Sequence, residues 1–215
     1  MPAIYLYAFC LLPGDDAALD GAVLGNSDLD WLPPGLYQTV RLVSQGRVGA
    51  VIEADIDLTA MQQDDAQLVT AVVNHDRVIC DLFETLTLLP LRFGTQFVSE
   101  AALRSHLQSH ATDYQARLQS LVGKAEYCLK LAPLVLPTDQ AAPAEQQLTQ
   151  LQDALRQTFL AVQFESSSET SACRAYLLTE QSSAGLQQTV EAWQVTYPLW
   201  DISLSEARPP YHFAN

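Results

Sequence analysis

Two histidines that lie four residues apart, His106 and His110, are the clearest candidate metal ligands in the sequence. Residues at positions i and i+4 share one face of a helix, so both imidazoles could reach the same ion. The glutamate of an H-E-x-x-H motif is missing, and Asp113 is the only nearby third ligand. We therefore expect a helix flank on which histidine is tolerated, and no metal site.

Catalytic groups are equally sparse. His75 and Asp76 could form an acid–base pair, but neighbouring residues on a helix point about 100° apart and do not orient one another. Cys80 shares its predicted helix with Asp81 and Glu84, whose charges disfavour a reactive thiolate. The nucleophile-elbow, P-loop and dinucleotide-binding motifs are missing from the sequence. We predict no catalytic residues, no cofactor and no enzyme activity.

Arg92 is the only charged residue in the apolar stretch 88–97. A buried guanidinium needs a carboxylate or a carbonyl as its partner. We therefore expect Arg92 to form a structural ion pair, with the alternative that it recognises a partner molecule.

The C-terminal segment Pro209–Phe213 combines two prolines with the aromatic rings of Tyr211 and Phe213. Prolines restrict the backbone, and aromatic rings offer a large area for docking. We expect the segment to pack back onto the protein, with Trp193, Trp200 or Tyr197 as the receiving surface; a frayed tail is the alternative.

The elements that would position these residues follow from hydrophobic periodicity. The N-terminal part reads as a central strand (3–12), a hairpin (36–44 and 47–56, turning at Gln45-Gly46), a helix from Asp64, a strand (89–97), a helix capped by Ser99 and a strand (125–132). The first helix is predicted as amphipathic from apolar residues that recur at steps of three and four: Val69, Val72, Val73, Ile79, Leu82, Phe83 and Leu86. This order resembles a ferredoxin-like sandwich with its helices on one face.

The proline-rich stretch 133–144 is the best candidate for a linker. After it we expect a helix (148–162), a polar loop (165–171), a strand (172–179), a helix (186–193) and a strand (199–204). The predicted class is therefore α+β with two domains, residues 1–132 and a smaller βαβαβ-like domain at 133–215. Strand 125–132 could belong to the second domain instead.

The overall composition narrows the possible partners. Eleven Lys and Arg residues against 25 Asp and Glu residues give a net charge of −14, which disfavours nucleic acids and anionic lipid membranes. The four cysteines lie far apart, as is typical of a reducing cytoplasm. The apolar run at 3–12 is too short to span a bilayer.

Four segments, in order along the chain, resemble the gas vesicle protein F/L family. They are IYLYA at 4–8, VVNHDRVI at 72–79, LLPLRFGTQF at 88–97 and PPYHF at 209–213. Within these segments the candidate structural or interaction residues are His75, Arg92, Phe93, Gly94, Tyr211 and Phe213.

The resemblance implies an accessory protein of gas vesicle formation in the cytoplasm. Its expected partners are the small hydrophobic shell protein of the vesicle and other gas vesicle accessory proteins. A different class of function, a small-molecule-binding regulator or enzyme that uses His75 and Arg92 in a cleft, is the alternative. A pocket that contains both residues would favour the alternative, whereas an exposed apolar patch or a free sheet edge would favour binding of the shell protein.

Overall fold

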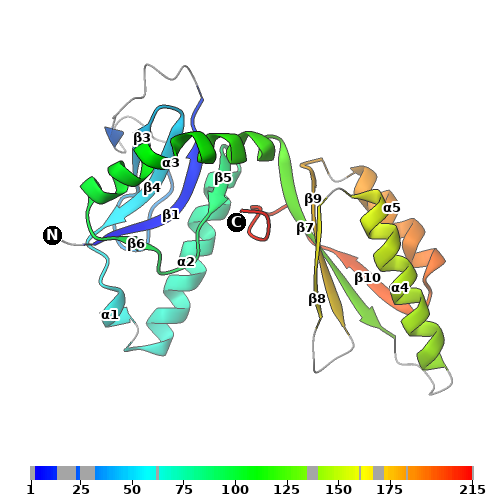
Figure 1. Ribbon diagram of the computed structural model, residues 1–215. Coiled ribbons are helices and arrows are strands. Elements are labelled where there is room, and N and C mark those ends of the chain that lie inside the picture. The colour runs from blue at the N-terminus through cyan, green and yellow to red at the C-terminus, as the bar shows by residue number, and fades with distance from the viewer. Residues whose placement is uncertain are drawn as a thin grey trace. The chain divides into compact units, whose positions relative to one another are not determined.

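The computed structural model describes residues 3–13, 23–24, 32–61, 63–134, 140–159, 161–166, 172–182 and 184–214. The chain divides into two compact units, one ending at Val122 and the other beginning at Gly123 (Figure 1). Each unit contains helices and one antiparallel sheet, so the predicted α+β class is confirmed. The division lies before residue 132, because strand β7 (Lys124–Pro133) pairs within the second sheet.

Strand β1 (Ile4–Leu11) is the centre of the first sheet. It pairs with β4 (Val48–Ala54) on one side and with β5 (Thr87–Pro90) and β6 (Gln96–Phe97) on the other. Beyond β4 the sheet continues with β3 (Arg41–Gln45) and β2 (Val23–Leu24). The predicted hairpin joins β3 to β4, and Gly46 supplies the positive φ of 55° in its turn.

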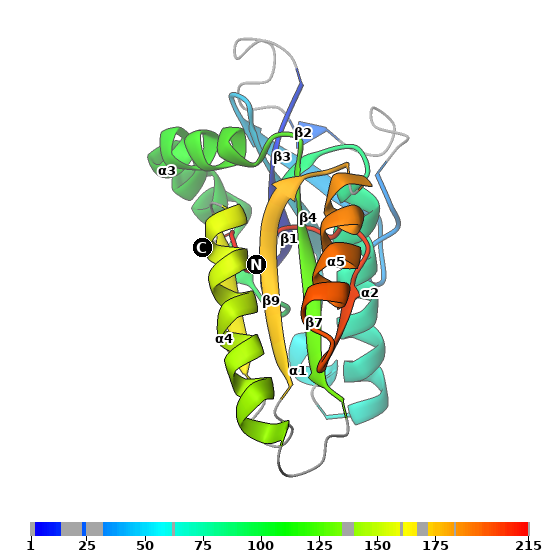
Figure 2. The same ribbon diagram turned by 90° about the vertical axis from the view of Figure 1, so that its right-hand side faces the viewer.

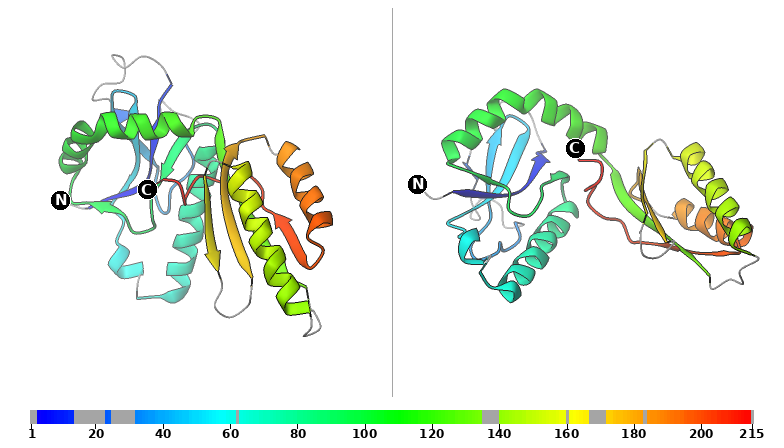
Figure 3. Two further views of the ribbon diagram at one scale, coloured as in Figure 1. Left: turned by 45° about the vertical axis from the view of Figure 1, so that its right-hand side comes forward. Right: turned by 60° about the horizontal axis from the view of Figure 1, so that its bottom comes forward.

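Two long helices cover opposite faces of this sheet, α2 (Asp65–Phe83) and α3 (Glu100–Leu121), as the right-hand view of Figure 3 shows. The register of β1 against β4 shifts between Leu6 and Ala8, so Tyr7 and Phe9 point to different faces. Tyr7 stacks on His75 of α2, whereas Phe9 stacks on Tyr114 of α3. The expectation that both helices share one face is therefore wrong; the unbroken apolar run of β1 is typical of a strand that is covered on both sides.

Helix α2 begins at its N-cap Asp64, whose side chain accepts hydrogen bonds from the N–H groups of Ala66 and Gln67. Ser99 caps α3 in the same way, as predicted. The short helix α1 (Leu58–Met61) precedes α2. The residues that α2 buries are Ala71, His75, Val78, Ile79 and Leu82.

Three of the four valines of α2 are not among its buried residues. Val69, Val72 and Val73 are 63%, 42% and 62% exposed, although they belong to the apolar spacing from which the helix was predicted. At about 100° per residue, Val69 lies roughly 120° around the helix from His75, which belongs to the face that meets the sheet. Helical spacing alone did not identify which of two apolar stripes is the inner one.

The second unit has the order β7, α4 (Ala141–Thr158), β8 (Val162–Ser166), β9 (Cys173–Glu180), α5 (Ala184–Thr196) and β10 (Trp200–Leu204). Its sheet runs β10-β7-β9-β8 with every pair antiparallel. This βαββαβ arrangement is ferredoxin-like. A ferredoxin-like arrangement was predicted for the first unit instead. The difference is β8, which the sequence analysis assigned to the end of a helix and the start of a loop.

Helices α4 and α5 pack on one face of the second sheet (Figure 2). They bury Leu151, Leu155, Leu186 and Val190. Part of the expected linker 133–144 belongs to α4, where Pro143 is tolerated because the first-turn N–H groups lack helical partners. The remaining linker positions 135–139, and positions 167–171 of the expected polar loop, lie outside the described residues.

Candidate functional site

The first unit contains a fully buried carboxylate, Glu53 on β4. The backbone N–H groups of Leu36, Tyr37 and Gln38 donate hydrogen bonds to its two oxygens over 2.6–2.7 Å. The hydroxyl of Tyr7 donates to Oε2 as well. Glu53 therefore holds the loop 35–38 against the sheet.

Glycine is required at the start of this loop. A Cβ atom at Gly35 would lie 2.1 Å from Oε2 of Glu53, which is far inside van der Waals contact. Sequence reasoning missed the arrangement. Two features of the sequence could have indicated this arrangement. One is the single acidic residue inside the apolar strand Val48–Ala54, and the other is the Pro33-Pro34-Gly35 sequence that precedes the hairpin.

His75 lies beside this carboxylate site and is also buried. Its Nε2 donates to the carbonyl oxygen of Leu91 over 3.0 Å, so its Nδ1 is free to accept the hydroxyl proton of Tyr5 over 2.7 Å. The rings of Tyr7 and Phe93 pack against the imidazole at centroid distances of 5.3 and 5.7 Å. With both nitrogens engaged inside the protein, His75 joins α2, β1 and the segment after β5.

Burial lowers the pKa of His75 below its usual value of 6.5 and keeps the imidazole neutral. The unfolded chain regains the usual pKa, so below about pH 6.5 it binds more protons than the folded chain. The free energy of unfolding should therefore fall with decreasing pH in this window, by up to about 1.4 kcal/mol per pH unit. Above the window His75 contributes no pH dependence.

Urea unfolding between pH 7.5 and pH 5.5 tests this behaviour. The expected result is a steeper loss of stability in the wild type than in His75→Gln, which cannot titrate. Parallel pH profiles for the wild type and His75→Gln would contradict the expectation.

The neighbouring segment 91–95 is a turn between the short strands β5 and β6, so the continuous strand predicted at 89–97 is interrupted. Gly94 has φ of +88° and is the third residue of a β-turn that Thr95 closes by donating its backbone N–H to the Arg92 carbonyl over 3.2 Å. A positive φ at this position is the reason for a glycine in a type II turn. The turn places the ring of Phe93 against Tyr5 and His75.

Arg92 does not share the burial of its neighbours. It is exposed, and its side chain makes no ion pair with any residue that the structure describes. The expected structural ion pair of Arg92 is therefore wrong. The backbone turns at Arg92. Its side chain is therefore exposed, although its neighbours in the sequence are apolar.

His106 and His110 take part in an aromatic cluster on α3. Their rings stack at a centroid distance of 4.3 Å, and Nε2 of His106 lies 2.7 Å from the hydroxyl of Tyr114. His110 donates from Nδ1 to the carbonyl oxygen of His106. Within the described part of the chain, no three His, Cys, Asp or Glu residues are grouped as metal ligands would be.

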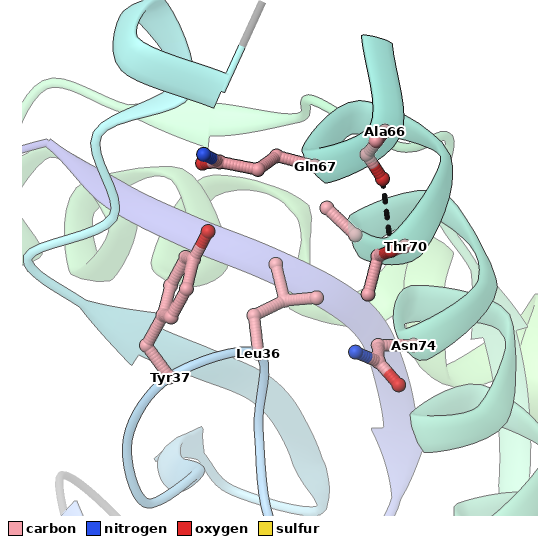
Figure 4. A pocket seen from close by; sticks show the side chains of 7 residues that line it. Leu36, Tyr37, Ala66, Gln67, Thr70 and Asn74 are labelled. Carbon is pink, nitrogen blue, oxygen red and sulfur yellow. Dashed lines mark hydrogen bonds between the residues drawn. The ribbon is translucent and has the colours of Figure 1, made fainter. Parts of the chain in front are cut away.

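A pocket of about 320 Å³ lies between the loop that Glu53 holds and the helix α2 (Figure 4). The loop contributes Leu36 and Tyr37 to its wall, and α2 contributes Ala66, Gln67, Thr70, Ala71 and Asn74. The wall is mostly apolar. Neither His75 nor Arg92 lines this pocket, so it is not the cleft of the alternative function.

The C-terminal segment packs on the face of the second sheet that α4 and α5 leave open. Glu126 on β7 and Arg208 exchange two backbone hydrogen bonds of 2.9 Å, and Pro209 and Pro210 are buried. His212 then contacts Glu126 twice, with its backbone N–H and with Nδ1, each over 2.7 Å. Its ring stacks on Tyr176 of β9 at a centroid distance of 3.4 Å.

The expected anchors of this segment differ from the observed one. Tyr211 and Phe213 are only half-buried, and His212 makes the specific contacts. Two of the expected receiving residues make other contacts, since Trp200 donates its indole N–H to the carbonyl oxygen of Ala144 and Trp193 packs against Phe159. Stacking of His212 depends on Tyr176, which is remote in sequence, so local composition did not reveal it.

Among the described residues, no helix has both the length and the apolar character of a membrane span. No curated protein matches the chain. The crystal structure of the gas vesicle protein GvpF from Anabaena sp. PCC7120 is similar, with a TM-score of 0.72 and 16% identity over 100% of this chain and 97% of that chain. GvpF from Microcystis aeruginosa gives a TM-score of 0.70 and 17% identity over 100% of both chains. At these low identities, the two similarities establish a shared fold and nothing more.

The sequence itself matches a family model. Residues 3–141, which include the hairpin, helices α2 and α3 and the segment 88–97, match the model of the gas vesicle synthesis protein GvpL/GvpF. The match covers more than half of the chain, and the folds agree along its length. The chain belongs to the gas vesicle synthesis protein GvpL/GvpF family.

Proposed function

We propose that the protein is an accessory factor of gas vesicle formation that binds the small hydrophobic shell protein. Membership of the GvpL/GvpF family carries this proposal. The arrangement of side chains supports it, because α2 exposes apolar residues to solvent, whereas neither His75 nor Arg92 lines the pocket beside α2. Both observations favour a binding protein over a small-molecule enzyme.

The candidate residues have different roles in this proposal. His75, Phe93 and Gly94 hold the first unit together, and the segment of Tyr211 and Phe213 stabilises the second. Arg92 is exposed and therefore suits contact with a partner, such as another gas vesicle accessory protein. The protein would work at the gas vesicle and would need no cofactor.

A pull-down with the purified full chain as bait tests the proposal. Shell protein solubilised from washed gas vesicles should be retained on the bait, and an unrelated acidic protein of similar size should not retain it. Repeated failure to retain the shell protein would contradict the proposed binding.

The fate of the protein after assembly is a separate question. If it is a permanent minor component, antibodies should detect it on purified vesicles that have been washed extensively, and comparison of intact with collapsed shells would show which face carries it. A transient assembly factor would be lost on washing while still binding the shell protein in the pull-down.

A further inference from the structure

Helix α2 exposes a stripe of three valines, which we call the valine stripe: Val69, Val72 and Val73. Val69 and Val73 lie one turn apart, and both are more than 60% exposed. Valine at exposed helix positions is unfavourable in two ways, because it is a β-branched residue with a poor helix propensity and because it leaves apolar area in water. Among the described residues of the first unit, the packing of α2 does not require these valines, since α2 uses another face to meet the sheet.

The surroundings of the valine stripe are strongly acidic. Positions 64–84 contain five acidic residues and one base. Asp65 precedes Val69 by one turn and Asp76 follows Val72 by one turn, so the stripe has a carboxylate towards each end. The one base, Arg77, donates to Asp81 over 2.8 Å and to the carbonyl oxygen of Pro34 over 2.9 Å.

The pocket described above lies on the same helix. Ala66 and Thr70 of its wall lie within one helical turn of Val69 and Val73, and Tyr37 on the loop side is 62% exposed. An apolar segment that covers the valines could therefore place one side chain in the pocket. Helix-in-groove recognition combines a stripe of this kind with an adjacent hollow.

We propose that the valine stripe and the adjacent pocket are the surface that binds the shell protein, through an apolar segment that carries Lys or Arg near its ends. The inference rests on the proposed function. The apolar character of the stripe fits a hydrophobic client, and the carboxylates select basic flanks by charge complementarity. A second copy of this chain fits poorly, because antiparallel self-association of the stripe would bring Asp65 of one copy near Asp76 of the other.

Isosteric substitution tests the apolar contact. The full-length variant Val69→Thr/Val72→Thr/Val73→Thr keeps the shape of each side chain and replaces one methyl group by a hydroxyl group. We expect the Kd for solubilised shell protein to rise about tenfold, which corresponds to about 1.4 kcal/mol. Val195→Thr is the matched control, because Val195 is an 81% exposed valine on α5, and it should leave the Kd unchanged.

A second variant tests the charges. Asp65→Asn/Asp76→Asn should weaken binding several-fold at low salt and reduce the salt dependence of the Kd. Asp201→Asn, at an exposed position of β10, is its control. The urea midpoint of the threonine variant should stay close to that of the wild type, since Val69, Val72 and Val73 are exposed, and the midpoint of each aspartate variant is measured beside its Kd.

The outcomes separate the inference from the proposed function. If the wild type binds shell protein and the triple threonine variant binds equally well, the valine stripe is not the surface, while the proposed function stands. If the wild type does not bind, both fail. If the wild type is a dimer by analytical ultracentrifugation and the threonine variant is a monomer, the stripe joins two copies of this chain and the inference is overturned.

Discussion

Replacing Glu53 by alanine should lower the free energy of unfolding by about 3–5 kcal/mol. The substitution removes the common acceptor of three backbone N–H groups and of the Tyr7 hydroxyl. A buried donor without a partner costs about 1–3 kcal/mol, and the sum is reduced where water can enter the vacated space. In the wild type, burial, and after it the hydrogen bond to Glu53, raises the pKa of Tyr7 well above its usual range, so the phenol stays protonated and donates to the carboxylate.

Urea unfolding at pH 7, followed by far-ultraviolet circular dichroism, measures the loss. Glu53→Gln should fall between the wild type and Glu53→Ala, because the amide keeps one acceptor oxygen but turns an NH₂ group towards backbone donors. Glu180→Ala, at an exposed position of β9, should change stability by less than about 0.5 kcal/mol. A loss below about 1 kcal/mol for Glu53→Ala would show that the loop 35–38 does not depend on this carboxylate.

Deleting residues 209–215 should destabilise the protein by about 2–4 kcal/mol. The deletion exposes the area that Pro209 and Pro210 cover, and it leaves the buried carboxylate of Glu126 without the two hydrogen bonds from His212. The ring of Tyr176 loses its stacking partner at the same time. Thermal and urea unfolding of the truncated chain measure the effect.

The single substitution His212→Ala should reproduce part of this loss, and His110→Ala, at an exposed histidine, should not. Amide hydrogen exchange gives an independent readout, because the N–H groups of Arg208 and His212 both donate hydrogen bonds and should exchange slowly. Fast exchange at both positions, together with unchanged stability of the truncated chain, would show that the segment does not dock.

Local signals in the sequence predicted much of the framework. The Gln45-Gly46 turn, the Ser99 cap and the alternation of strand 125–132 each depend on residues within one element, and the structure has all three. Strand β8 was not predicted, because it is a short edge strand in which only Val162 and Phe164 show the apolar alternation of a strand. Without β8, the ferredoxin-like order of the second unit could not be recognised.

The candidate sites depended on contacts between distant parts of the chain. Glu53 accepts hydrogen bonds from residues 36–38, and His212 stacks on Tyr176; no spacing rule connects these positions. The exposure of Arg92 and of Val69, Val72 and Val73 was not predicted, for a different reason. Apolar spacing predicts that a stripe will be covered, and an exposed binding surface has the same pattern as a core-facing one.

The number of gas vesicles in a strain that lacks this protein tests its role in vesicle formation most directly. Vesicles should be absent or strongly reduced in electron micrographs of the deletion strain, and the wild-type gene should restore them. Vesicles of normal number and shape in the deletion strain would contradict a role for the protein in gas vesicle formation.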